Sequence, residues 1–247
     1  MNKLAINGAP PVRDEPWPKW PQYEKATKSA IARVSESEVY CSQVGKEVEQ
    51  FEEEFAAYHG TSEAVAVANG TISLQAALAA AEIGCGDEVI VPAYTFAATA
   101  SAAVENNSIP VFVDSERQSQ GLDPEDVRRK ITPRARAIMP VHVNGYPCEM
   151  DAVMEIAEEH DLVVIEDCSH AHGAEYRGRK VGTIGHFGCF SLQQKKNLSV
   201  GEGGIFVTND SEAAERIRQM RGFYWEPVTR NWRMGEFYAA IGREQLK

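Results

Sequence analysis

Asp167 and Lys196 are the two residues whose types and positions most directly suggest chemistry in this chain. Asp167 ends the apolar run LVVIED, and Lys196 lies between the apolar segment CFSL and the glycine cluster GEGG. A lysine amine can form a Schiff base with an aldehyde cofactor, and a carboxylate can keep a pyridine nitrogen protonated. We therefore predict a pyridoxal 5'-phosphate (PLP) site in which Lys196 is the covalent residue and Asp167 the partner of the ring nitrogen.

Lys196 has a neighbour of the same type, Lys195. Because adjacent residues of extended chain usually point to opposite sides, we expect one lysine to face a pocket and the other to face solvent. An ordinary surface pair of lysines is the alternative interpretation. An enclosed Lys196 should have a lowered pKa, which would make its amine a competent nucleophile and proton carrier.

Three further segments can contribute to a cofactor site. Gly70 and Thr71 stand where a strand ends and a helix begins, so backbone N–H groups and a hydroxyl are available to an anion; an ordinary capped turn is the alternative. Phe96 directly follows a strand and can stack on a flat ring, or simply pack in the core. His170 lies close to Asp167 in the sequence, and we place it beside the cofactor.

The histidines also suggest a metal. His170 and His172 form an HxH pair, and His142 and His186 are nearby in the sequence. Two histidines with this spacing can lie on one side of a strand. No acidic or cysteine ligand set completes the group convincingly, so we predict no metal site.

The composition limits the classes of partner. The chain has 247 residues, 43% of them hydrophobic and 25% charged, and a net charge of −11 that argues against a nucleic-acid surface. The five cysteines are an odd number and include no CxxC pair, which favours a reducing, cytoplasmic setting. No apolar run reaches the ~18 residues of a membrane helix. We expect small molecules or a second copy of the chain as partners.

The order of elements predicts an α/β protein. Residues 1–22 contain prolines 10, 11, 16, 18 and 21 and are expected to form an extended arm, while residues 23–247 form one large domain. A helix is expected over 44–58, with Val44, Val48, Phe51 and Phe55 on one face and the acidic run 52–54 on a solvated face. From residue 64 onward strands and helices alternate, and segments 186–193 and 203–210 are two strands joined by a loop. This pattern predicts a three-layer α/β/α domain with a mixed, mostly parallel sheet, whose ligands lie beyond the carboxyl ends of the strands.

Taken together, several segments resemble the DegT/DnrJ/StrS sugar aminotransferases of PLP fold type I, including ANGTISLQAALAA, VVIEDCSHAHGA, CFSLQQKKNLSVGEGG and NWRMGEFYAAIG. The resemblance implies that Lys196 forms the Schiff base, that Asp167 contacts the pyridine nitrogen, that His170 lies against the cofactor and that Phe96 stacks on its ring. It also implies a phosphate site made by Gly70, Thr71 and Ser191. Asn231 resembles the asparagine that reaches the phosphate of a neighbouring subunit, which implies a homodimer.

The resemblance implies transfer of an amino group from glutamate or glutamine to a keto sugar or keto cyclitol. A dehydratase branch of the family carries histidine in place of the lysine, so Lys196 favours transamination. Members of the family continue through a smaller C-terminal domain, which we expect to be absent or truncated here; a non-catalytic fragment is therefore a further alternative. A nucleotide-binding Rossmann protein is disfavoured because the GxGxxG fingerprint is missing.

Overall fold

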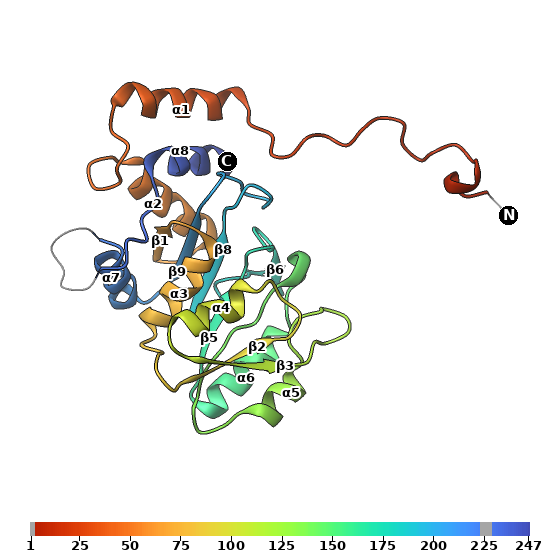
Figure 1. The fold of residues 1–247 in the computed structure, drawn as a ribbon, viewed down its shortest axis with the longest axis vertical. Helices are drawn as coiled ribbons and strands as arrows, with labels where there is room; N and C mark the ends of the chain where they lie inside the picture. Colours follow the sequence, from red (N-terminus) through yellow and green to blue (C-terminus); the bar gives the residue numbers. More distant parts are fainter. Residues whose placement is uncertain (1–2, 223–228) are drawn as a thin grey trace.

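A seven-stranded sheet runs through the molecule in the order β1-β9-β8-β5-β4-β2-β3 (Figure 1). In this computed structural model, residues 3–222 and 229–247 are described. The strands are β1 (Glu63–Val67), β2 (Glu88–Pro92), β3 (Ile109–Val113), β4 (Ala135–Ile138), β5 (Val163–Asp167), β8 (Phe187–Ser191) and β9 (Gly204–Thr208). β9 runs antiparallel to β1 and β8, and the other neighbouring strands are parallel. The predicted mixed, mostly parallel sheet is confirmed.

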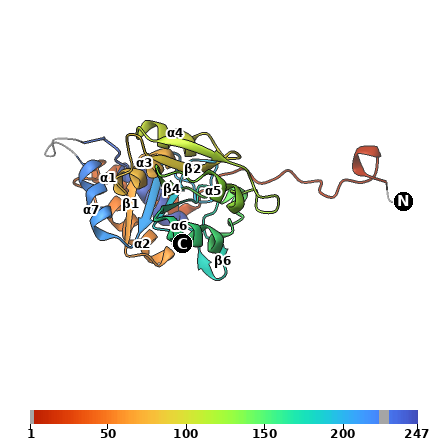
Figure 2. The same ribbon diagram turned by 90° about the horizontal axis from the view of Figure 1, so that it is seen from below.

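Helices cover both faces of the sheet, as Figure 2 shows from below. One face packs on α3 (Gly70–Ala80), α4 (Ala98–Glu105) and α7 (Ser211–Met220). The other packs on α2 (Glu47–His59), α5 (Pro124–Lys130), α6 (Met150–His160) and α8 (Glu236–Gln245). Because side chains alternate along a strand, Val65 and Val67 of β1 join the first core, and Ala64 and Ala66 join the second. The predicted three-layer α/β/α architecture follows from this alternation and is confirmed.

Local sequence signals set several element boundaries. α5 begins at Pro124, and the Asp123 side chain caps it by accepting a hydrogen bond from the N–H of Glu125. β4 ends at Ile138, before Pro140, and beyond it an isolated bridge pairs Val141 with Asp167. The sequence patterns did not predict helix α8 or the short antiparallel pair β6 (Glu175–Tyr176) and β7 (Arg179–Lys180).

Two expectations about the second helix are wrong. α2 begins only at Glu47, so Val44 precedes it and is 73% exposed instead of sharing its apolar face. Glu52 belongs to no solvated face: it is 7% exposed, accepts a hydrogen bond from the N–H of Ala66 at 2.8 Å and forms an ion pair with Arg221. A buried carboxylate of this kind requires a cationic partner, and Arg221 supplies it from a segment that helical periodicity cannot identify.

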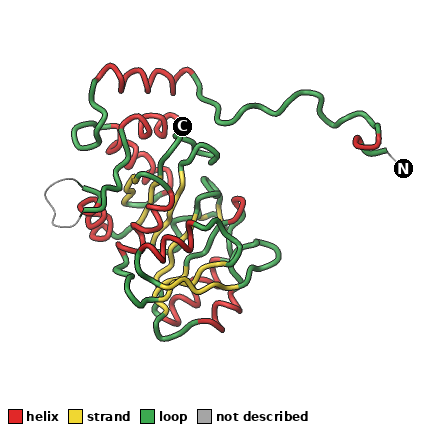
Figure 3. The backbone as a smooth tube through the Cα atoms, in the orientation of Figure 1, coloured by secondary structure: helices red, strands yellow, loops and turns green. Residues whose placement is uncertain are grey.

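The N-terminal segment extends from the body of the molecule before α1 (Lys25–Ser37), and α1 packs on α8 (Figure 3). The structure describes this arm from residue 3, and a 3-10 turn at Ala5–Asn7 is its one helical element there. Within the described residues, we find no helix with the length and apolar character that a membrane span requires.

Candidate active site

A cavity of about 1060 Å³ contains all eight predicted site residues in its wall. They come from the start of α3, the segment before α4, the end of β5, the end of β8, the loop after β8 and the segment before α8. The eight are Gly70, Thr71, Phe96, Asp167, His170, Ser191, Lys196 and Asn231. The fold therefore brings together residues from six separate segments, and their individual roles stay predictions.

Asp167 is buried at the carboxyl end of β5 and is held at both oxygens. The hydroxyl of Thr99 donates to Oδ2 at 2.9 Å, and the backbone N–H of Ser169 donates to Oδ1 at 3.1 Å. The hydroxyl of Thr95 lies 2.7 Å from the hydroxyl of Thr99 and extends this chain of hydrogen bonds. The carboxylate is thus fixed in orientation toward the cavity. Thr99 was not identified from the sequence. Its position three residues after Phe96 is the feature that could have indicated a place near the cofactor.

Lys196 lies half-buried in the loop after β8, and its backbone N–H donates to the carbonyl of Gln193 at 2.8 Å. Burial lowers the pKa of the Lys196 amine below its ordinary value, although the negative charge of Asp167 acts in the opposite direction. Lys195 is exposed, yet it also borders the cavity. The exposure of Lys195 and the partial burial of Lys196 agree with the expectation that one lysine faces solvent and the other is enclosed, although the two lie in a turn and not in extended chain.

The N-terminus of α3 lies in the cavity wall, and its first amides cannot be paired within the helix. The Asn69 side chain accepts from the N–H of Ile72 at 2.9 Å and caps the helix, while the N–H groups of Gly70 and Thr71 have no intrahelical acceptor. Ser191 faces Gly70 so closely that a Cβ on Gly70 would lie 2.5 Å from the Ser191 Cβ. Two amides and two hydroxyls therefore converge where a phosphate can be held.

The Gly70→Ala substitution should weaken PLP binding by roughly tenfold or more, because the added methyl group must displace Ser191 from this anion site. Equilibrium dialysis against PLP measures the effect. Gly84→Ala is the matched control, since its added Cβ meets nothing closer than 3.8 Å. A folded Gly70→Ala variant that binds PLP as tightly as the Gly84→Ala variant would contradict the assignment.

Phe96, His170 and Asn231 complete the set of predicted site residues in the cavity wall. Phe96 is 75% exposed, which excludes the core-packing alternative. Burial and the charge of Lys196 lower the pKa of His170, with Asp167 acting in the opposite direction. Asn231, which the family resemblance assigns to a neighbouring subunit's site, lies in the cavity wall of its own chain.

Several polar residues in the wall carried no recognisable sequence signal. Glu105 accepts a hydrogen bond from Gln75, and Arg230 lies over the ring of Trp232 and donates to Asn106 at 3.4 Å. They come from the interior of one helix, the end of another and the segment before α8, so only the folded chain brings them together.

His142, Glu166 and Cys168 form the one group of possible metal ligands found among the described residues. Their donor atoms are already used within the protein. His142 Nδ1 accepts from the N–H of Cys148 and its Nε2 faces Glu166 at 3.0 Å, while Glu166 also accepts from backbone N–H groups of the β7–β8 connection. Burial raises the pKa of the Cys168 thiol to about 12. We assign these residues a structural role on the face of β5 opposite to Asp167.

Two other histidines, the buried His59 and the part-buried His172, lie around the Phe190 ring. The Nε2 of His59 and both ring nitrogens of His172 are shielded from solvent, and none makes a hydrogen bond of ordinary geometry in the described part of the chain. Burial lowers the pKa of His59 to about 4 and that of His172 to about 3. Both are therefore neutral near pH 7.

Acidification should destabilise the protein through these two histidines. Between an ordinary pKa near 6.5 and the lowered folded values, the unfolded chain binds more protons, so stability falls as pH decreases from about 6.5 toward 4. The expected slope is about 1 kcal/mol per pH unit for each histidine. Urea unfolding of the wild type across this range measures the slope, and His59→Gln should reduce it. An unchanged slope in His59→Gln would refute the linkage.

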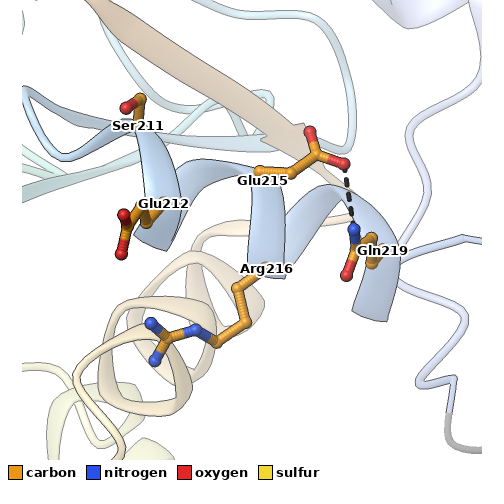
Figure 4. Close-up of a pocket in the computed structure, with 5 residues that line it drawn as sticks. All are labelled: Ser211, Glu212, Glu215, Arg216 and Gln219. Atoms are coloured by element: carbon orange, nitrogen blue, oxygen red, sulfur yellow. Dashed lines mark hydrogen bonds between the residues drawn. The ribbon is translucent and has the colours of Figure 1, made fainter.

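A shallower depression of about 420 Å³ lies on α7 (Figure 4). Gln219 donates to Glu215 within it, and Arg216 is directed to the neighbouring helix, where it donates to the carbonyl of Ala80 and pairs with Glu82. The side chains of Gln219, Glu215 and Arg216 thus already have partners within the protein, and we propose no binding site or reaction in this depression.

Comparison with known proteins agrees with this fold. The DegT/DnrJ/EryC1/StrS aminotransferase family matches residues 21–247, and the chain belongs to this family. It is 42% identical over 223 residues to the L-glutamine:2-deoxy-scyllo-inosose aminotransferase of Streptoalloteichus tenebrarius, covering 88% of this chain and 53% of that protein. It is 43% identical over 216 residues to the GDP-perosamine synthase of Caulobacter vibrioides, covering 84% and 58%.

Solved structures give the same result. The aminotransferase from Psychrobacter cryohalolentis superposes with a TM-score of 0.90 at 39% identity, covering 94% of this chain and 63% of that one. The PLP-dependent transferase fold is thereby established for this chain. The chain spans little more than half the length of these two curated relatives, so their complete activities apply to it only as proposals.

Proposed function

We propose that this chain is the cofactor-binding part of a PLP-dependent aminotransferase that moves an amino group from glutamate or glutamine to a keto sugar or keto cyclitol. The observation that carries the proposal is the convergence of a half-buried lysine, a buried and oriented aspartate and an open helix N-terminus around one cavity. The residues fit PLP, because Gly70 leaves Ser191 and two free amides room for a phosphate and Asp167 offers a fixed carboxylate to a ring nitrogen.

Each residue has a distinct role in the proposed reaction. When bound, PLP supplies an electron sink for the negative charge that develops on the α-carbon of the amino donor. The Asp167 carboxylate, which Thr99 and Ser169 hold in place, would stabilise a positive charge on the ring nitrogen. Lys196 would hold the cofactor through Nζ, and the free amine would accept the α-proton of the donor as a general base. Its lowered pKa increases the fraction of neutral amine.

The relatives support the substrate class. The name of the Streptoalloteichus relative specifies glutamine as donor and a keto cyclitol as acceptor. The name of the Caulobacter relative specifies synthesis of a nucleotide-linked amino sugar. We propose the same class of acceptor here, bound at the side of the cavity where Gln75, Glu105 and Arg230 offer hydrogen-bonding groups. We also propose a homodimer, in which a second copy covers the exposed Phe96 side of the cavity.

An isotope experiment tests the reaction. The chain is incubated with PLP, glutamine labelled with ¹⁵N at its α-amino group, and 2-deoxy-scyllo-inosose. Transfer of ¹⁵N into an aminated cyclitol supports the proposal. Loss of a hydroxyl without gain of nitrogen would instead indicate the dehydratase branch. A chain that binds PLP but consumes neither substrate would indicate a fragment without catalysis.

A further inference from the structure

The base of the N-terminal arm contacts the loop that carries Lys196. The indole N–H of Trp20 donates to the backbone carbonyl of Lys196 at 3.1 Å, across 176 positions of sequence. Tyr23 reaches the same loop, because its hydroxyl lies 3.5 Å from the Oγ of Ser199. The Ser199 hydroxyl in turn donates to the carbonyl of Gln194 at 3.1 Å. The arm thus contacts the loop at Lys196 itself and at a residue beyond it.

The loop by itself fixes only one side of the Lys196 backbone. The N–H of Lys196 donates to Gln193 within the loop, and the N–H of Gln194 donates to Gly201 at 2.9 Å and closes its base. For the Lys196 carbonyl, the Trp20 indole is the hydrogen-bond donor that we find among the described residues. The peptide group that follows Lys196 is therefore held from outside the loop.

We propose that Trp20 is a positioning residue, which holds the backbone of Lys196 through its indole N–H and keeps the lysine amine directed into the cavity. Tyr23 supports the same contact through Ser199, and we call Trp20 and Tyr23 together the arm latch. The chemical importance of the latch rests on the proposed function of Lys196. The contact itself is a property of the chain without cofactor and can be tested without it.

The position of Trp20 favours this role over simple packing. Its side chain is 54% exposed, so hydrophobic burial does not account fully for its placement. Indole can donate a hydrogen bond but cannot accept one, which matches the carbonyl that it meets. Loosening the loop would also expose the Lys196 amine to water and remove the burial that lowers its pKa.

Trp17 provides a matched control within the same arm. It is 80% exposed, and its ring lies under the guanidinium of Arg13 at 4.7 Å. The Trp17→Phe and Trp20→Phe substitutions therefore make the same chemical change, but only the second removes a donor to the Lys196 loop.

Two measurements on the purified chain without PLP test the latch. Amide hydrogen exchange of the 192–203 peptide should become roughly fivefold faster in Trp20→Phe, the effect of losing one hydrogen bond. Competitive acetylation over a pH series should place the titration midpoint of the Lys196 amine higher in Trp20→Phe, because the burial that lowers its pKa is reduced. Trp17→Phe should match the wild type in both. Tyr23→Phe should shift both in the same direction by less, and it decides the question if Trp20→Phe does not fold.

Unchanged exchange and an unchanged Lys196 midpoint in a folded Trp20→Phe variant would overturn the proposal. Equal changes in Trp17→Phe would also overturn it, because they would show a general effect of the arm. Borohydride reduction with PLP separates this outcome from failure of the proposed function. If the wild type acquires no adduct on Lys196, the function fails, while the exchange and acetylation results still decide the latch.

Discussion

Lys196→Ala should abolish both the covalent attachment of PLP and amino transfer. The half-buried Lys196 lines the same cavity as Asp167 and His170. Removing it eliminates the nucleophile and the general base together, and the loss of proton transfer alone is worth about 10²–10⁴-fold in rate. We expect no adduct after borohydride reduction and a fall in the rate of the glutamine half-reaction of at least about 10³-fold.

Lys195→Ala is the control for this substitution, because Lys195 borders the same cavity but is exposed. It should retain the adduct on Lys196. A small primary amine added to Lys196→Ala should restore part of the proton transfer. Full turnover by Lys196→Ala without added amine, or an adduct that moves to Lys195 in the wild type, would show that Lys196 does not have the assigned role.

Asp167→Asn should slow the chemical step while the protein remains folded. The amide preserves the shape of the side chain, and its carbonyl can still accept one of the two hydrogen bonds from Thr99 and Ser169. The negative charge opposite the ring nitrogen is lost, so the positive charge of the ring is no longer stabilised. Removing one such electrostatic contact costs roughly 10²–10³-fold in rate. Stopped-flow absorbance of the glutamine half-reaction gives the rate.

Glu166→Gln tests whether this effect is specific to the cavity side of β5. Glu166 is buried on the opposite face of the strand, where it pairs with His142 and accepts three backbone N–H groups. Breaking this buried pair should cost about 3–5 kcal/mol of folding stability. Asp167→Asn should instead lose rate with little loss of stability. Near-normal rates in Asp167→Asn would reject its pairing with the ring nitrogen.

Much of the fold could be predicted because the chain repeats a simple pattern. Strands β1, β2, β3 and β4 are each followed by an α-helix before the next strand, and such units form a parallel sheet with functional residues at the carboxyl ends of strands. Asp167 could be identified in this way because an acid directly ends an apolar run. The eight predicted residues consequently lie around one cavity.

The remaining features depend on contacts that sequence periodicity does not contain. Thr99 was missed because its contact with Asp167 joins residues 68 positions apart. Trp20 was taken as part of a free arm because proline content indicates extended chain but not what that chain touches. Glu52 was assigned to a solvated face because its partner Arg221 comes from the far end of the domain. In each case a long-range polar contact determined the role of the residue.

Borohydride reduction of the wild-type chain after incubation with PLP, followed by peptide mass analysis, tests the central claim most directly. The account predicts one pyridoxyl group, located on Lys196, absent from Lys196→Ala and retained in Lys195→Ala. This result would show that the cavity assembles a functional cofactor site within these 247 residues. A well-folded chain that acquires no adduct, or acquires it only on Lys195, would contradict the account.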